Sequence, residues 1–238
     1  MAAPALRARL DRLDWDALQS SLDRRGYALT PPVLSAGQCR EIAALLEQPR
    51  RFRKRVEMAR RNYGEGEYRY FRYPLPRPVY ELRRRLYPPL ARIANRWAER
   101  LRRAERYPGS LREFLDLCHA GGQRLPTPLL LDYAAGGHNR LHQDRYGALW
   151  FPLQVACCLS RPGREFTGGE FLLLENVPRQ QSRAEALNPE RGALLIFPGG
   201  ERPVRGARGE ARVSVQHGLS RVRSGRRTAL GIIFHDAV

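Results

Sequence analysis

Hydrophobic positions follow a helical period in the first half of the chain and a strand period in the second half, with the change near residue 125. Each helical stretch has its own signals, because Asp or Ser precedes the apolar run, or Pro opens it, and Gly or Pro follows it. The predicted helices are Asp14–Arg25, residues 35–48, residues 78–101 with an interruption at Pro88-Pro89, and residues 110–120.

After Pro126, short apolar segments alternate with turn residues, which predicts strands. Many short strands at even spacing are typical of a sandwich or barrel, and the preceding helices would pack on one outer face. We therefore expect an α+β fold in one compact domain, made of a helical region, residues 1–125, and a strand-rich core, residues 126–238. The predicted strands are residues 127–134, 151–160, 168–176, 192–198, 212–222 and 226–236.

Composition places the chain among globular proteins, with 238 residues, 42% hydrophobic and 28% charged. The net charge of +18 attracts polyanions such as nucleic acid. Lys54 is the only lysine, so the charge is almost all arginine, as a GC-rich genome produces. The charge alone therefore leaves open whether the basic surface binds a partner or reflects codon usage.

The sequence contains no apolar run of membrane-spanning length, and charged residues interrupt the first 18 positions, where a secretory signal would need an apolar core. The four cysteines show no metal-binding spacing, which is typical of reduced thiols. We expect a cytoplasmic protein that does not bind membranes, and the sequence makes no prediction of its oligomeric state.

The strongest chemical signal is His142-Gln143-Asp144 together with His217 downstream. Residues i and i+2 of an extended segment lie on the same side, so His142 and Asp144 can bind one ion, and His217 can complete the set. Two histidines and one carboxylate leave open positions on the metal, which suits non-haem Fe(II). A single His-x-Asp pair is common by chance, so this signal needs support.

Support comes from Arg227, which lies ten residues after His217, beyond a predicted hairpin turn at Ser224-Gly225. A guanidinium group binds a carboxylate through two parallel hydrogen bonds. An arginine buried near the metal would need an anion, and a dicarboxylate co-substrate that chelates the metal at its other end would supply one.

These residues, in this order and spacing, resemble the 2-oxoglutarate/Fe(II)-dependent dioxygenases, in the prolyl-hydroxylase-like branch. The whole chain also resembles a bacterial family of predicted nucleic-acid-modifying oxygenases, in the segments GEGEYRYFRYPLP, PTPLLLDY, RLHQDRYG, FTGGEF and LGIIFHD. The matching features of the superfamily are His142-x-Asp144, the tail pattern HxLxxVxxGxR from His217 to Arg227, the strand Gly168-Gly169-Glu170-Phe171, and Tyr133.

The resemblance implies a double-stranded β-helix, a jelly roll of two facing sheets. It implies that His142, Asp144 and His217 hold Fe(II), and that Arg227 and Tyr133 bind the far carboxylate of 2-oxoglutarate, with Thr228 as a weaker candidate. The implied reaction uses O₂ to hydroxylate a substrate C–H bond, which on an N-methyl group leads to demethylation.

The substrate is suggested by residues 50–77, where arginines alternate with aromatic residues. Aromatic and guanidinium planes stack on bases, and Gly64 and Gly66 could make the segment a mobile lid. An equally good alternative is that the aromatic residues pack on the sheet and the arginines form a solvated edge. The candidate substrate residues are Tyr68, Tyr70, Arg72, Asn139, Arg145 and Tyr146.

Three functions remain open on the sequence. The first is a dioxygenase that acts on nucleic acid, and the second is a hydroxylase of a protein side chain such as proline. The third is a non-catalytic nucleic-acid-binding protein on an oxygenase scaffold.

Overall fold

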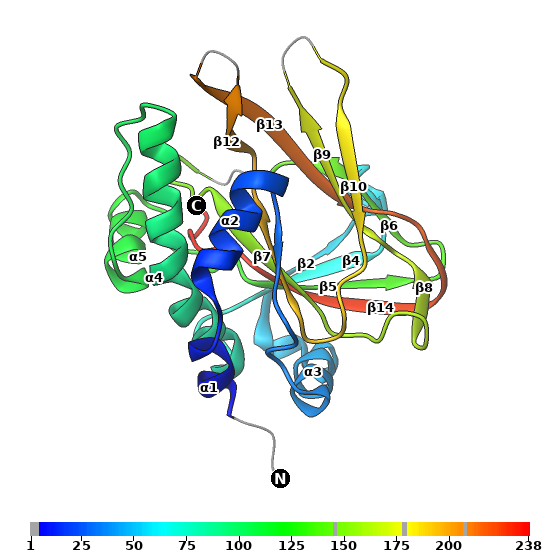
Figure 1. The fold of residues 1–238 in the computed structure, drawn as a ribbon. Coiled ribbons are helices and arrows are strands. Elements are labelled where there is room, and N and C mark those ends of the chain that lie inside the picture. The colour runs from blue at the N-terminus through cyan, green and yellow to red at the C-terminus, as the bar shows by residue number, and fades with distance from the viewer. Residues whose placement is uncertain (1–4, 145–146, 178–179, 207–208) are drawn as a thin grey trace.

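The computed structural model describes residues 5–144, 147–177, 180–206 and 209–238. Within these residues, two largely antiparallel sheets face each other, and helices cover the outer face of one of them (Figure 1). The predicted α+β class with helices packed on one face is confirmed, and two facing sheets are what a double-stranded β-helix requires.

The larger sheet takes strands from both halves of the chain. Its strands are β1 (Ala28–Leu29), β2 (Phe52–Glu57), β4 (Glu67–Phe71), β5 (Leu129–Ala134), β7 (Leu153–Cys158), β8 (Phe166–Gly168), β11 (Leu194–Pro198) and β14 (Val222–Ile232). Their order in the described part of the sheet is β1-β11-β7-β14-β5-β4-β2, and β8 pairs with β14.

The smaller sheet carries the two predicted histidine ligands. Its strands are β3 (Gly64–Glu65), β6 (His138–His142), β9 (Phe171–Asn176), β10 (Arg183–Leu187), β12 (Glu201–Gly206) and β13 (Gly209–Leu219). Their order is β10-β9-β13-β6-β3, and β12 pairs with β13.

The helices are α1 (Leu6–Asp11), α2 (Trp15–Arg25), α3 (Ala36–Ala43), α4 (Arg77–Arg100) and α5 (Leu111–Ala120), with short 3-10 helices at Ala44–Glu47, Pro49–Arg51 and Ala59–Arg61. α2, α4 and α5 lie within a residue or two of the predicted bounds, the helix predicted at residues 35–48 ends as α3 at Ala43 and continues as a 3-10 turn, and α1 was not predicted. The Asp14 side chain caps α2, and Ser35 and Ser110 form capping boxes with Gln38 and Glu113.

The predicted interruption at Pro88-Pro89 is wrong, because α4 runs through both prolines as one helix. Each proline removes a backbone donor and disfavours the helix interior. The same helix buries a long apolar face that includes Leu86, Tyr87 and Leu90, and this packing offsets the local cost.

Strand β7 shows how the two sides of the larger sheet differ. Leu153, Val155 and Cys157 point outward into the main core, where the helices pack. The alternate residues Gln154, Ala156 and Cys158 therefore face the space between the sheets. Figure 1 shows α4 and α5 together on the helical side of this sheet.

The basic and aromatic segment is built into the sheets and does not form the free lid that the glycines suggested. β2 and β4 pair with each other, and β4 pairs with β5. Phe71 is fully buried and stacks on Phe52, and Arg55 and Arg69 form ion pairs with Glu67. The helical half of the chain thus supplies strands as well as helices.

The hairpin turn predicted at Ser224-Gly225 is also wrong. β13 ends at Leu219 and β14 begins at Val222, so the chain passes from one sheet to the other before these residues. Gly225 lies inside β14 with a φ of 76°, and a Cβ atom there would lie 2.0 Å from the carbonyl oxygen of Glu165. The glycine therefore permits a close approach of two backbones.

A buried ion pair ties α4 to the end of the chain. Arg83 is 1% exposed and donates to the Asp236 carboxylate over 2.8 Å and to the carbonyl oxygens of Ile233 and Phe234. None of the helices in the described ranges has the length and apolar composition of a membrane span.

We expect Arg83→Met to lower the free energy of unfolding by about 3 kcal/mol, because it leaves the Asp236 carboxylate buried without its guanidinium partner. Urea unfolding followed by circular dichroism measures this change. The matched control is Arg84→Met on the same helix, where the side chain is 46% exposed and the expected change is under about 0.5 kcal/mol. Equal losses in the two variants would contradict this account.

Candidate active site

Two histidines face each other across neighbouring strands of the smaller sheet. His142 ends β6 and is the register partner of His217 in β13. Their ring centroids are 4.3 Å apart. A one-residue slip in this pairing would turn one ring to the other face of the sheet, so the register itself brings the two imidazoles together.

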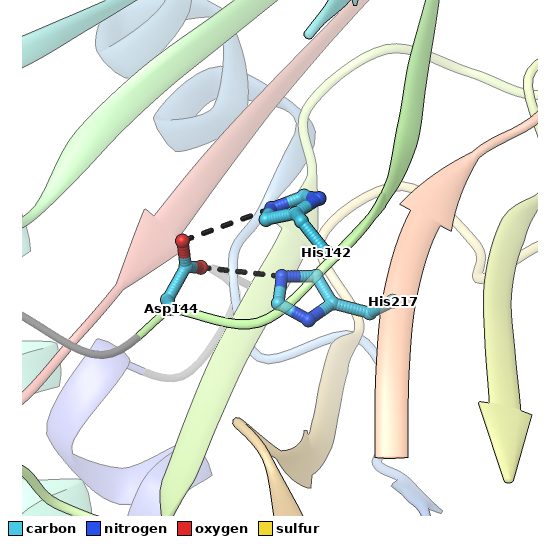
Figure 2. Close-up of side chains that lie close together, drawn as sticks. All are labelled: His142, Asp144 and His217. Carbon is cyan, nitrogen blue, oxygen red and sulfur yellow. Dashed lines mark ion pairs between the residues drawn. The ribbon is translucent and has the colours of Figure 1, made fainter. Parts of the chain in front are cut away.

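Asp144 completes a three-residue cluster. Its Oδ1 lies 3.7 Å from His142 Nε2, and its Oδ2 lies 3.2 Å from His217 Nε2. The three ligand atoms lie within 4.8 Å of one another (Figure 2). Two imidazole nitrogens and one carboxylate converging on a point form a donor set that fits a divalent transition metal with open positions.

Gln143 fixes the segment between His142 and Asp144. Its side-chain nitrogen donates to the carbonyl oxygens of Gly200 and Val215, each over 2.8 Å. Alternation along an extended segment directs Gln143 away from its two neighbours, so it fastens their backbone to β13 while they point at the cluster. The sequence analysis gave Gln143 no role.

The environment of His142 favours a neutral imidazole whose Nε2 atom faces the cluster. His142 Nδ1 lies 2.7 Å from the carbonyl oxygen of Arg140, which makes Nδ1 the donor and leaves Nε2 for a ligand. Burial and the neighbouring His217 ring lower the pKa of His142 below its ordinary value. The His217 ring packs against Phe171 and Phe197, with centroids 5.9 and 4.8 Å away.

The cluster borders a cavity of about 410 Å³ between the two sheets. Arg227 and Tyr133, register partners on β14 and β5, also line this cavity. Burial raises the pKa of Tyr133 well above its ordinary value, and its hydroxyl hydrogen-bonds with the Asn139 side chain. The neutral phenol therefore remains a hydrogen-bond donor at neutral pH.

Arg227 is a buried cation without a counter-ion among the described residues. It is 4% exposed, and within the described residues it forms no ion pair and its Nε has no hydrogen-bond partner. Gly169, with a φ of 63°, makes room for it, because a Cβ atom there would lie 2.9 Å from Arg227 Cδ. A buried, unpaired guanidinium is costly unless an anion joins it, so this end of the cavity fits a carboxylate.

The other predicted site residues divide into three groups. Tyr68, Tyr70 and Asn139 line the cavity with the cluster. Thr228 and Arg72 do not line it, and Arg145 and Tyr146 lie outside the described residues.

The positions of Thr228 and Arg72 disagree with the roles predicted for them, co-substrate binding for Thr228 and substrate binding for Arg72. Thr228 follows Arg227 in a strand and so points to the other side, where its hydroxyl donates to Asp132 over 3.2 Å. Arg72 follows β4, has an exposed side chain and donates its backbone N–H to the Arg51 carbonyl oxygen.

The sequence analysis also missed Gln154, which lines the cavity from β7. The available signal was a single amide in the apolar run FPLQVACC, at a position that alternation places opposite the outward-facing residues.

Comparison with known proteins agrees with this geometry. A model of the Oxygenase-NA family, described as "Oxygenase, catalysing oxidative methylation of damaged DNA", matches residues 66–237. Two Mycobacterium tuberculosis proteins, "Uncharacterized protein MT2286" and "Uncharacterized protein Rv2227", are each 48% identical over 167 residues, which are 70% of this chain and 72% of theirs.

Solved structures share the fold at low identity. A Pseudomonas putida prolyl-4-hydroxylase matches with a TM-score of 0.52 and 14% identity, over 94% of this chain and 100% of that chain. A Trichoplax adhaerens prolyl hydroxylase, in complex with a hypoxia-inducible-factor peptide, matches with a TM-score of 0.54 and 13% identity, over 97% and 92%. A 2OG-Fe(II) oxygenase family protein from Burkholderia pseudomallei matches with a TM-score of 0.51 and 15% identity, over 95% and 94%.

The family match covers most of the chain, includes all three residues of the cluster and includes Arg227. The resemblance seen in the sequence is confirmed. The chain therefore belongs to the Oxygenase-NA family and is an oxygenase.

Proposed function

We propose that this protein is a 2-oxoglutarate- and Fe(II)-dependent dioxygenase that oxidises a base of nucleic acid. One observation carries the co-substrate assignment. A single cavity contains both the cluster of two histidines and one aspartate and the buried Arg227, which lacks a counter-ion among the described residues.

His142, Asp144 and His217 are the residues that would hold Fe(II). Arg227 and Tyr133 would bind the far carboxylate of 2-oxoglutarate, the guanidinium through two hydrogen bonds and the phenol through one. Thr228 is left out of this assignment because it bonds to Asp132 on the other side of the strand.

When bound, the iron and 2-oxoglutarate would activate O₂, which is the oxidant: one oxygen atom would oxidise 2-oxoglutarate to succinate and CO₂, and the other would enter a substrate C–H bond. The chain's own residues position these groups and exclude water. Leu129, Leu131, Phe197 and Ala229 give the cavity an apolar lining for that purpose. A hydroxylated N-methyl group then loses formaldehyde.

Nucleic acid is favoured as the substrate by the family description, which concerns damaged DNA, and by the residues around the cavity. Tyr63 lines the cavity and is 49% exposed, and Arg140 lines it with an exposed side chain. Arg61 is exposed two residues before Tyr63. An exposed aromatic ring can stack on a base, and the nearby arginines can neutralise phosphates.

We expect His217→Ala to weaken metal binding on the order of 100-fold or more, because loss of even an outer-shell partner of a metal ligand costs about 10- to 100-fold. Titration with Mn(II), an O₂-stable substitute for Fe(II), followed by electron paramagnetic resonance measures the affinity. His138→Ala on β6, outside the cluster, is the control and should bind Mn(II) as the wild type does. Unchanged affinity in His217→Ala would rule out this metal site.

The function is tested by succinate formation from 2-oxoglutarate, Fe(II) and O₂, with and without single-stranded oligonucleotides that carry methylated bases. We expect the oligonucleotide to increase succinate formation in the wild type, with formaldehyde release from N-methyl groups, and Asp144→Ala to form none.

Tyr63→Ala should raise the oligonucleotide concentration that gives half-maximal stimulation about 10-fold, since stacking on one ring contributes about 1–3 kcal/mol. Its control is Tyr80→Ala on α4, where the side chain is 47% exposed but does not line the cavity. Succinate formation that depends on Asp144 and ignores every oligonucleotide would keep the oxygenase and reject nucleic acid, which turns the search to protein side chains.

A further inference from the structure

The floor of the cavity consists of rows that run across β7, β14, β5 and β4. In one row, Ala229 pairs with Cys158 and with Leu131, and Leu131 pairs with Tyr68. In the next row, Gly231 pairs with Ala156 and with Leu129, and Leu129 pairs with Tyr70. The order of these rows along the strands shows which lining residues lie near each other and which lie far apart.

Arg227 and Gln154 lie at opposite ends of this floor. Arg227 and its partner Tyr133 form the row before the first, two residues from Ala229 and Leu131. On the antiparallel strand β7, Gln154 lies two residues beyond Ala156 and so belongs to the row after the second. Successive rows are two residues apart, so six residues along the strands separate Arg227 from Gln154. With strands rising about 3.3 Å per residue, the two positions are roughly 20 Å apart along the sheet. The five-carbon chain of 2-oxoglutarate, held at Arg227, is much too short to reach Gln154.

Gln154 is linked to the metal cluster through a single residue, Phe197. Its register partner on β11 is Phe197, and the Phe197 ring centroid lies 4.8 Å from that of His217. Gln154 thus borders the end of the cavity opposite Arg227, and Phe197 connects this end to the cluster. A substrate that reaches the metal occupies this end.

Among the described residues, the Gln154 amide nitrogen has no hydrogen-bond acceptor. The side chain is 4% exposed and lines the cavity, and its Nε2 atom is buried without a hydrogen-bond partner within the described ranges. Gly199 leaves space for this amide, because a Cβ atom there would lie 2.8 Å from Nε2. Buried amide nitrogens in folded proteins almost always have an acceptor, so a bound ligand is expected to supply it.

The surroundings of Gln154 select the kind of ligand. The neighbouring lining residues Ala156, Leu129, Ile233 and Phe197 are apolar, which disfavours a phosphate or another charged group. Tyr70 adds an aromatic face at the same end. A nucleobase is flat and largely apolar, and it carries ring nitrogens and carbonyl oxygens that accept hydrogen bonds.

We propose that the Gln154 amide nitrogen donates a hydrogen bond to a ring nitrogen or carbonyl oxygen of the substrate base and so positions the base over the metal centre. Gln154 is therefore a substrate-positioning residue, and this inference rests on the proposed function. Because a base inside a duplex cannot reach the cavity, the target nucleotide must be single-stranded or turned out of the helix.

The test measures binding of two single-stranded oligonucleotides by fluorescence anisotropy, with Mn(II) and 2-oxoglutarate present. One carries a methylated base at its centre, and the other has an abasic site there. In the wild type, we expect the methylated oligonucleotide to bind at least 10-fold more tightly, since both share the phosphate contacts and only one has a base to insert.

In Gln154→Met, which keeps the side-chain length and removes the donor, we expect this preference to fall about 10-fold, with unchanged affinity for the abasic oligonucleotide. Gly199→Ala should act in the same direction by displacing the amide, and it provides a second variant that leaves the glutamine in place. Gln181→Met, an exposed glutamine, is the control and should keep the wild-type preference.

The outcomes separate the inference from the function on which it rests. A wild-type preference that survives in both Gln154→Met and Gly199→Ala would overturn the role of Gln154 and leave the proposed substrate standing. Equal binding of the two oligonucleotides by the wild type would reject insertion of a base, and the inference would fall with the proposed substrate.

Discussion

The guanidinium of Arg227 lies between two sheets with no carboxylate beside it among the described residues. A protein interior tolerates such a charge only where a ligand joins it. The neighbouring residues of the site are arranged around this charge. Gly169 leaves room for the side chain, Tyr133 places a neutral donor beside it, and the metal cluster borders the same cavity. The charge gives the cavity one end that fits an anion, and the end opposite it is the one lined by Gln154.

Both sheets and both halves of the chain are needed to build this cavity. The smaller sheet holds His142 and His217 in register, and the larger sheet provides the floor with Arg227. Tyr68 and Tyr70 come from β4, in the half of the sequence that reads as helical, and they form the wall beyond Leu131 and Leu129. The boundary near residue 125 is therefore a change of sequence pattern, and both sides of it contribute to one site.

The metal cluster could be predicted because His142 and Asp144 are related by the local geometry of an extended segment. Helix caps at Ser35 and Ser110 were predictable for the same reason. Non-local packing decided what the sequence analysis missed. Burial of its apolar face keeps α4 helical through Pro88-Pro89. Pairing with β5 makes part of the arginine-rich segment a strand. Alternation alone could have placed Gln154 on the cavity side of its strand and excluded Thr228, whereas the link from Gln154 to His217 through Phe197 needed the register of β7 and β11.

The most direct test compares 2-oxoglutarate with 2-oxobutyrate, a shorter 2-oxo acid that lacks the far carboxylate, by calorimetric titration of the Mn(II)-loaded protein. The wild type should prefer 2-oxoglutarate on the order of 100-fold, as expected for charge-assisted hydrogen bonds in a buried site. Arg227→Met should lose nearly all of this preference, whereas Arg223→Met, an exposed arginine of the same strand, should keep it. A preference that persists in Arg227→Met would contradict the claim that Arg227 is held in the protein for the co-substrate carboxylate.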